Sequence, residues 1–476
     1  MNSLQTKLDR ILNRELDGFK TIASIERLTG GASQETFSID CQTVSGPLRL
    51  ALRRAPGGVR QSKEAGSIGL TAEAVLLDIA KHQGIQVPNI LYSLKPEDNI
   101  GDGFLMNWCE GETLGAKIAK SERFENIRPS LARQCGEILA KIHSTDLSKS
   151  GLKTILKEIS PRDYVKVTWE DYKRYETPQP MIDYAAQWLL KNLPEPTIPS
   201  LVHNDFRNGN LIVSENSGIV AVLDWEVAHI GDPNRDLGWL CTPSWRFGQH
   251  ALPVGGFGEM EDLLEGYSSV TGTTPSARSL KFWQVFGSFW WAVHCLTMAH
   301  HYRHGPDKTV ERPAIGRRSS ECQIDLVNFL IPGRITTVEQ QNEVQKNIPT
   351  DIELLTSVRD FLRSDIAEIA KGRKKFLNLV ASNSLDILIR ENKLGRPFEQ
   401  HELDGLRSLL RKEGELDDLR QELTMLIRND NTTLDNPFLQ QHLRDTVAFR
   451  VSVDQPIYAG LITARQNSLA LKAQAL

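Results

Sequence analysis

One segment of the sequence, LVHNDFRNGNLIVSENSGIVAVLDWE at 201–226, places polar side chains at intervals that suit phosphate chemistry. Asp205 is followed after five residues by Asn210, and Asp224 comes fourteen residues later. Phosphoryl transfer from ATP needs a group that accepts a hydrogen bond from the incoming hydroxyl, and oxygen ligands that hold Mg²⁺ against the phosphates. An Asp and an Asn on one loop, with a second Asp at the end of an adjacent strand, supply these groups.

Two other interpretations of this segment are weaker. A surface turn followed by a hairpin would use Asn and Gly for their backbone geometry alone, but it would not require His, Asp, Asn and Asp together. A zinc site built on His203 and Asp205 lacks a further His or Cys at ligand spacing nearby.

The same segment resembles the signature of the aminoglycoside phosphotransferase family, which has a protein-kinase-like fold, and the resemblance extends over about 20–330. It implies that Asp205 is the catalytic base or hydroxyl-orienting residue, and that Asn210 and Asp224 are the Mg²⁺ ligands. His203 takes the position of the kinase His, which is usually structural. ATP and Mg²⁺ are the cofactors that this resemblance implies.

The region 1–110 predicts an N-terminal amphipathic helix and a small antiparallel, nucleotide-binding lobe with one helix at 70–82. A Gly-rich turn in LTGGASQETFSI, 28–39, could cradle phosphates through its backbone N–H groups. Gly30, Gly31 and Ser33 are therefore predicted to contact ATP. A plain hairpin would explain this turn equally well, since the kinase G-x-G-x-x-G spacing is absent.

The strand LALR, 50–53, resembles the kinase strand that carries the phosphate-binding Lys, with Arg53 in its place. The adjacent Arg54 leaves the register open by one residue. Glu73, on the following helix, is the expected acidic partner of Arg53, although a solvent-facing helix charge is the alternative. The segment GFLMNWCEGETL, 103–114, resembles the hinge between kinase lobes, so Asn107 and Trp108 are predicted to meet adenine through the backbone.

Helical periodicity dominates the rest of the chain. Residues 111–332 predict a large, mainly helical catalytic lobe, 333–349 a polar linker, and 350–476 a helical accessory domain whose first helix is capped by Thr350 or Asp351. The predicted fold class is α+β: a bilobal protein-kinase-like phosphotransferase fold followed by an all-α C-terminal domain.

Composition limits the partners. A formal charge of -4 gives no support for a nucleic-acid partner, and the six cysteines are too scattered for a disulfide framework or zinc ribbon. The charged N-terminus is unlike a signal peptide, and the uncharged stretch 282–300 has a polar stripe typical of a buried helix. A cytoplasmic protein with no membrane contact is expected.

The residues in and around the signature suggest the phosphoryl acceptor. HNDFRNGNLIV, LDWEVAHIGDPNRDLGWL and PAIGRRSSECQIDL resemble the branch of the family that is fused to, or encoded beside, acyl-CoA dehydrogenases. That resemblance implies phosphorylation of the hydroxyl of a hydroxyacyl-CoA thioester. Residues 351–476 resemble a small helical domain of unknown function that accompanies such enzymes and is expected to dock on the kinase lobes. Candidates for binding the CoA phosphates, each equally explained as surface charge, are Arg246, Arg303, Arg317 and Arg318.

Two alternatives remain open. A kinase for another small alcohol, such as an amino alcohol or aminoglycoside, could use the acidic segment EMEDLLE at 259–265 for a cationic acceptor. A nucleotide-binding pseudokinase scaffold is the second alternative: the Arg at position 53 favours it, whereas the intact Asp205, Asn210 and Asp224 oppose it.

Overall fold

The computed structural model describes residues 4–28, 34–59, 68–338, 348–430 and 434–474. The chain forms two compact units. Unit 1 consists of Met1–Ser160 and Glu195–Trp283, and unit 2 consists of Pro161–Pro194 and Gln284–Leu476.

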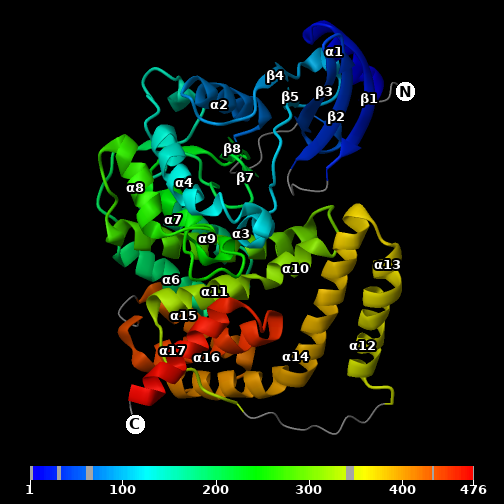
Figure 1. Cartoon of the computed structure of the whole chain (residues 1–476). Helices are drawn as coiled ribbons and strands as arrows, with labels where there is room; N and C mark the ends of the chain where they lie inside the picture. The colour runs from blue at the N-terminus through cyan, green and yellow to red at the C-terminus, as the bar shows by residue number, and fades with distance from the viewer. Residues whose placement is uncertain (1–3, 29–33, 60–67, 339–347, 431–433, 475–476) are drawn as a thin grey trace. The chain divides into compact units, whose positions relative to one another are not determined.

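Unit 1 begins with a helix and a five-stranded antiparallel sheet whose strand order is β1-β2-β3-β5-β4 (Figure 1). The apolar face of α1, with Leu8, Ile11 and Leu12 fully buried, shares a core with the sheet. This arrangement is the small antiparallel lobe that the strand-like pattern predicts. Its elements are α1 (Leu4–Glu15), β1 (Phe19–Arg27), β2 (Glu35–Thr43), β3 (Gly46–Arg54), β4 (Ile90–Ser93) and β5 (Gly103–Asn107).

The rest of unit 1 combines helices with two short antiparallel ladders, β6 with β9 and β7 with β8. Apolar residues of α2, α4 and α8 join those of the ladders in one core, and α2 has the bounds expected from the sequence. The elements are α2 (Leu70–His82), α3 (Gly115–Lys120), α4 (Arg128–His143), β6 (Ser200–Val202), β7 (Leu211–Ser214), β8 (Gly218–Val222), β9 (His229–Gly231), α7 (Asn234–Leu240) and α8 (Met260–Thr271).

Unit 2 is helical in its described residues, and the long helix α9 (Ala277–His304) enters it from unit 1. Helices α6 and α11 pack against the C-terminal helices α15, α16 and α17. Two polar contacts join these parts: Arg428 Nε donates to Asp183 at 2.6 Å, and Tyr458 donates to Asp325 at 2.7 Å. The elements are α5 (Pro161–Lys173), α6 (Pro180–Lys191), α10 (Glu311–Arg317), α11 (Ser319–Leu330), α12 (Asp351–Phe361), α13 (Ala367–Ile369), α14 (Gly372–Leu410), α15 (Leu416–Asn429), α16 (Pro437–Asp454) and α17 (Ala459–Gln474).

The start of α12 shows which of the two predicted caps is used. Thr350 accepts a hydrogen bond from the Glu353 N–H, and the Glu353 side chain accepts one from the Thr350 N–H, which forms a capping box. The apolar face that follows is only partly covered, because Leu354 and Val358 are each about half exposed. No helix among the described residues has the length and apolar character needed to cross a membrane.

Candidate active site

Asp205 lies in the loop between β6 and β7, where three side chains hold its carboxylate. Oδ1 accepts hydrogen bonds from Trp239 Nε1 at 2.9 Å and from Arg207 Nε at 3.0 Å. Asn210 Nδ2 donates to the other oxygen, Oδ2, at 2.5 Å. A carboxylate has about four lone-pair sites. These three bonds therefore orient Asp205 and leave it able to accept a hydrogen bond from a hydroxyl group.

The β7–β8 hairpin explains why Asn210 and Asp224 lie close together although fourteen residues separate them. Leu211 pairs with Val222, so Asn210 stands directly before the hairpin and Asp224 two residues after it. The Leu223 N–H donates to the Asn210 carbonyl at 2.8 Å and closes the open end of the ladder. Asp224 has a φ of 68°, a left-handed conformation that an Asp adopts more readily than most residues, and the chain leaves the strand there.

Asn210 and Asp224 suit a Mg²⁺ ion that is bound largely through phosphates. Mg²⁺ is usually held by one or two protein side chains and substrate phosphates, and not by an all-protein cage. Because the Asn210 amide donates through Nδ2, its Oδ1 is the end that could face a cation. Among the described residues, no group of three or more His, Cys, Asp or Glu side chains could hold a metal ion.

The predicted pair of Arg53 and Glu73 is present, with Arg53 Nε donating to Glu73 Oε2 at 3.1 Å. Arg53 Nη2 also donates to Asp224 Oδ1 at 2.5 Å and to Glu226 Oε2 at 3.2 Å. Arg54 instead pairs with Glu35, its cross-strand neighbour, at 2.9 Å. The expected pair of Arg53 and Glu73 is thus present, whereas the place of Arg53 at the phosphates stays a prediction.

Burial and neighbouring charges act in opposite directions on the pKa values of Arg53 and Glu73. Burial disfavours the charged guanidinium, but the carboxylates of Glu73, Asp224 and Glu226 raise the pKa of Arg53 overall. Burial raises the pKa of Glu73, and Arg53 opposes that rise. Arg53 therefore stays charged and joins the carboxylate on α2 to the one that is predicted to bind the metal.

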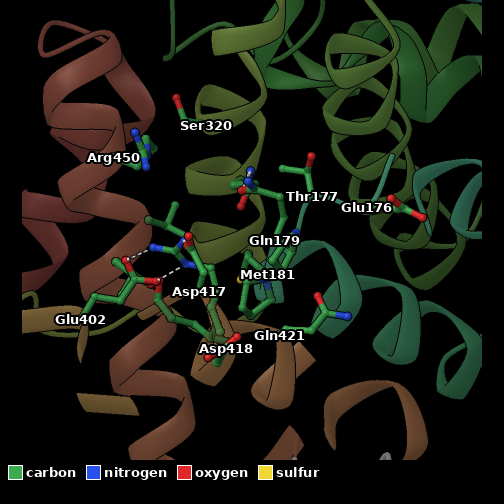
Figure 2. Close-up of a pocket in the computed structure, with 17 residues that line it drawn as sticks. Glu176, Thr177, Gln179, Met181, Ser320, Glu402, Asp417, Asp418, Gln421 and Arg450 are labelled. Carbon is green, nitrogen blue, oxygen red and sulfur yellow. Dashed lines mark hydrogen bonds and ion pairs between the residues drawn. The ribbon is translucent and has the colours of Figure 1, made fainter. Parts of the chain in front are cut away.

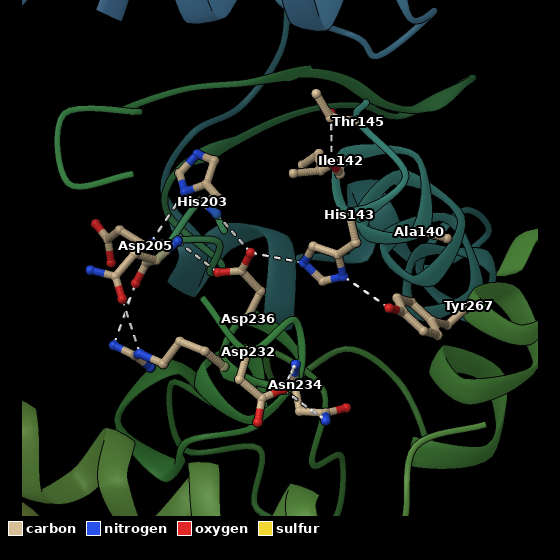
Figure 3. Close-up of polar contacts among 12 residues, drawn as sticks. Ala140, Ile142, His143, Thr145, His203, Asp205, Asp232, Asn234, Asp236 and Tyr267 are labelled. Atoms are coloured by element: carbon tan, nitrogen blue, oxygen red, sulfur yellow. Dashed lines mark hydrogen bonds and ion pairs between the residues drawn. The ribbon is translucent and has the colours of Figure 1, made fainter. Parts of the chain in front are cut away.

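Asp236, on α7, holds the backbone that leads into Asp205, and Figure 3 shows it between that loop and His143. Its Oδ2 accepts from the His203 N–H at 2.8 Å and its Oδ1 from the Asn204 N–H at 2.7 Å. His143 Nε2 lies 3.1 Å from Oδ2. Burial alone would raise the pKa of Asp236, but these partners hold it below its ordinary value. Sequence reasoning missed this residue because nothing in its spacing ties it to position 205.

His203 is fully buried, and its ring packs 4.6 Å from that of Trp225. Its Nε2 lies 3.1 Å from the Leu223 carbonyl, and its Nδ1 accepts from the Asp205 N–H at 3.2 Å. Burial lowers the pKa of His203, which favours the neutral ring. These contacts support the structural role that the resemblance implies.

Comparison with known proteins identifies the family. The phosphotransferase enzyme family matches residues 24–272, just over half of the 476-residue chain. The chain belongs to this family. This match agrees with the family resemblance of the segment 201–226. A domain of unknown function, DUF6285, matches residues 368–458, within the predicted helical accessory domain.

Two curated relatives of this chain are named for acyl-CoA dehydrogenases. Acyl-CoA dehydrogenase family member 10 of Mus musculus is 31% identical over 210 residues, which cover 41% of this chain and 19% of the relative. Family member 11 of Pongo abelii is 24% identical over 444 residues, which cover 86% of this chain and 52% of the relative. The chain thus spans about half, or less, of the length of these relatives. The resemblance to this branch is confirmed.

A solved structure supports the fold class. A putative aminoglycoside phosphotransferase from Ralstonia eutropha matches with a TM-score of 0.54 at 21% identity, over 68% of this chain and 97% of that one. Together with the family match, this likeness confirms an α+β, protein-kinase-like phosphotransferase fold followed by a helical C-terminal region.

The predicted nucleotide contacts in the small lobe are placed only in part. Asn107 ends β5, and its N–H donates to the Asn89 carbonyl, while the Trp108 N–H donates to the Arg49 carbonyl. An adenine contact by Asn107 or Trp108 would thus have to use a carbonyl oxygen or a side chain. The remaining candidates, Gly30, Gly31 and Ser33, lie outside the described residues.

The structure does not bring the four candidate arginines together in one unit. Arg246 lies in unit 1, near the end of α7, whereas Arg303, Arg317 and Arg318 belong to unit 2. Arg317 pairs with Asp454 at 2.6 Å, and Arg318 pairs with Glu321. Both line a pocket of about 660 Å³ against α14, together with as many acidic side chains as basic ones.

A second pocket of unit 2, of about 520 Å³, lies between α6, α11, α15 and α16, and Figure 2 shows it. Its ionisable lining is mainly acidic, and Arg420 is held by Glu402 through two hydrogen bonds of 2.7 and 2.9 Å. None of the predicted site residues lines this pocket. It therefore adds nothing to the predicted phosphoryl-transfer site, whose described members lie in unit 1.

Proposed function

We propose that this phosphotransferase moves a phosphoryl group from ATP to the hydroxyl of a hydroxyacyl-CoA, such as a 4-hydroxyacyl-CoA, in hydroxy-acid catabolism. The observation that carries the proposal is the convergence of Asp205, Asn210 and Asp224 around one hairpin end. Phosphoryl transfer depends almost entirely on positioning and charge compensation, and these three side chains provide the positioning groups.

In this mechanism Asp205 accepts a hydrogen bond from the acceptor hydroxyl and takes its proton as the new O–P bond forms and ADP leaves. Trp239 and Arg207 fix the direction of the carboxylate for that step. Asn210 and Asp224 would bind Mg²⁺, which supplies charge compensation for the phosphates. Arg53, braced by Glu73, would contact the nonreacting phosphates.

The acyl-CoA part of the proposal is supported by the names of the curated relatives, acyl-CoA dehydrogenase family members 10 and 11. Phosphorylation turns a hydroxyl into a better leaving group, which would prepare a hydroxyacyl chain for elimination. Residues 351–476 are proposed to support use of the acyl acceptor, since every proposed nucleotide and metal contact lies in unit 1. Neither another small alcohol as acceptor nor a scaffold without activity has an observation in its favour that outweighs these.

One experiment tests the proposal against both alternatives. The protein is incubated with Mg-ATP and a panel of hydroxyacyl-CoAs, free hydroxy acids, amino alcohols and aminoglycosides, and mass spectrometry detects addition of phosphate. Phosphorylated hydroxyacyl-CoA is the expected product. Transfer only to amino alcohols or aminoglycosides would favour the first alternative, and nucleotide binding without transfer would favour the scaffold.

A further inference from the structure

Lys120, Arg246 and His250 form a basic cluster in unit 1, where the end of α3 meets the loop that follows α7. A Cβ atom placed on Gly248 would lie 3.2 Å from Lys120 Nζ, so the lysine reaches the loop that carries the other two residues. The positive charges of Arg246 and Lys120 both act on the His250 ring. Among the described residues, neither Lys120 nor Arg246 has a carboxylate partner.

Two nitrogen atoms of this basic cluster are buried and have no hydrogen-bond partner among the described residues: Arg246 Nε and His250 Nε2. Arg246 does donate through Nη2 to the Cys241 carbonyl at 2.8 Å, which fixes the guanidinium in place. A buried donor without a partner costs free energy comparable to a lost hydrogen bond, so each such group needs an explanation. An anion could accept a hydrogen bond from Arg246 Nε, and from His250 Nε2 in the tautomer that carries the proton there.

Aromatic contacts connect the basic cluster to one side of Asp205. The Arg207 guanidinium stacks 4.3 Å from the Trp245 ring, next to Arg246, and bonds to Asp205 Oδ1. Trp239 bonds to the same oxygen, and its ring lies 5.0 Å from that of Trp245. Asn210, the predicted metal ligand, bonds to the other oxygen, Oδ2. Oδ2 of Asp205 therefore contacts the predicted metal ligand, whereas Oδ1 is linked through Arg207 and Trp239 to Trp245, the residue before Arg246.

We propose that Lys120, Arg246 and His250 bind an anionic group of the acceptor. The inference rests on the proposed function, because it takes Asp205 as the residue that meets the acceptor hydroxyl. Uncompensated cations in the basic cluster attract a phosphate or carboxylate and repel an amino alcohol or an aminoglycoside. Burial, and then the charges of Arg246 and Lys120, lower the pKa of His250, so its neutral ring adds a hydrogen bond and no further charge.

The anionic group has two possible sources with the same chemistry: the phosphates of a CoA thioester or the carboxylate of a free hydroxy acid. Steady-state kinetics with a hydroxyacyl-CoA, the matching hydroxyacyl-pantetheine, which lacks the phosphates, and the free hydroxy acid separates them. In Lys120→Gln and Arg246→Gln, KM should rise about tenfold, the size of one charge-assisted hydrogen bond. The rise should occur for the acceptor that supplies the anion and not for hydroxyacyl-pantetheine.

Lys117→Gln is the matched control, because Lys117 lies on the same helix, is exposed, and already pairs with Glu112 at 3.0 Å. Its KM values should stay within about twofold of the parent protein, well below the effect of one charge-assisted bond. Lys120→Arg should restore most of the loss, since it keeps the charge. Thermal unfolding of each variant checks that the fold is retained.

The binding of free coenzyme A and of the free hydroxy acid, measured by calorimetry without nucleotide, gives a second readout. The dissociation constant of one of them should rise in Lys120→Gln and Arg246→Gln. If both variants raise KM for Mg-ATP as much as for the acceptor, the basic cluster serves the nucleotide and the inference is overturned. Unchanged KM values and dissociation constants for every anionic compound would overturn it as well.

The inference and the proposed function can fail separately. If no member of the panel is phosphorylated but the variants still lose anion binding, the proposed function fails and the anion site stands. If hydroxyacyl-CoA is phosphorylated and the variants keep the parent KM and dissociation constant for every anionic compound, the proposed function stands and the anion site fails.

Discussion

At the scale of single residues, the proposed chemistry depends most directly on Asp205. Asp205→Asn should lower the rate of phosphoryl transfer by about 10² to 10⁴, because the amide cannot take the hydroxyl proton. Mg-ATP binding should persist, since Asn210 and Asp224 are unchanged. Single-turnover transfer and calorimetric titration with Mg-ATP measure the two effects.

Glu215→Gln, at the far turn of the β7–β8 hairpin, is the control for this substitution. Because Glu215 bonds only to the exposed Arg123 in the described structure, transfer should be unaffected. Near-normal turnover of Asp205→Asn would remove this residue from the catalytic role.

Arg53 and Arg54 are adjacent and differ in what they contact, which makes each a control for the other. Arg53→Ala leaves Glu73, Asp224 and Glu226 without their shared cation, so it should impair both transfer and Mg-ATP binding strongly. Arg54→Ala removes contacts with Glu35 and the Phe37 ring, both on the neighbouring strand. We expect kcat/KM for ATP to fall at least about tenfold further in the first variant, as for one charge-assisted bond. The reverse ranking would contradict the assignment of Arg53 to the phosphates.

At the scale of secondary-structure elements, α7 holds the loop that carries Asp205 through its residue Asp236. Asp236→Ala should leave two buried N–H groups, those of His203 and Asn204, without an acceptor. At about 1 to 3 kcal/mol for each unsatisfied group, the free energy of unfolding should fall by about 3 kcal/mol. Chemical denaturation measures the change, and residual transfer should be low even where the variant is folded. A variant with parent-like stability would show that the loop is held by other contacts.

The contact between α6 and α15 includes the ion pair of Asp183 and Arg428, and its loss should have an effect on stability that depends on pH. Asp183 is fully buried, burial raises its pKa, and hydrogen bonds from Arg428, Trp169 and Tyr172 oppose the rise. Arg428→Met should destabilise the protein by about 3 kcal/mol at pH 7, because a buried charge loses its partner. The folded state then binds a proton more tightly than the unfolded state, so stability falls as pH rises through the raised pKa. The destabilisation caused by Arg428→Met should therefore be smaller at pH 5 than at pH 7.

Denaturation of Arg428→Met at pH 5 and pH 7 checks this sign. Lys412→Met is the control, because the Lys412 and Glu422 side chains are both largely exposed and such pairs contribute about 1 kcal/mol or less. A loss that grows as pH falls would contradict a raised pKa for Asp183.

At the scale of the whole molecule, the helices after residue 350 contribute to the packing of unit 2. Tyr184 and Gln187 of α6 donate to carbonyls of Leu434, Ile427 and Arg428, and Asn328 of α11 donates to that of Gly460. We therefore expect a chain cut once by a protease site inserted at 339–347 to stay associated. Removal of the C-terminal fragment should lower the melting temperature while Mg-ATP binding is retained.

Size-exclusion chromatography of the cut protein, and thermal unfolding with and without the fragment, measure these outcomes. Use of the acyl acceptor should fall on removal and return when the fragment is added back. Fragments that separate on cutting at native pH would contradict the packing role.

The sequence by itself determined the features that depend on local spacing. These features are local, because backbone geometry fixes which nearby residues share a face or a turn. They are the step from Asp205 to Asn210, the strand–turn–strand pattern before Asp224, the period of two that separates Arg53 from Arg54, and the helix at 70–82. The signature that carries the family resemblance is also local, because it lies within 201–226. The start of α12 was local as well, since the sequence narrowed its cap to Thr350 or Asp351.

Only the tertiary structure decided which distant residues meet. Asp236 accepts from the backbone before Asp205, and Trp239 bonds to Asp205 itself, yet nothing in their separation along the chain indicates either contact. The partial exposure of Leu354, on a helix that the sequence gives an apolar face, also depends on its neighbours. The physical reason is that helix and strand periods fix the direction of side chains within one element. Contacts between elements depend on how all buried surfaces pack at once.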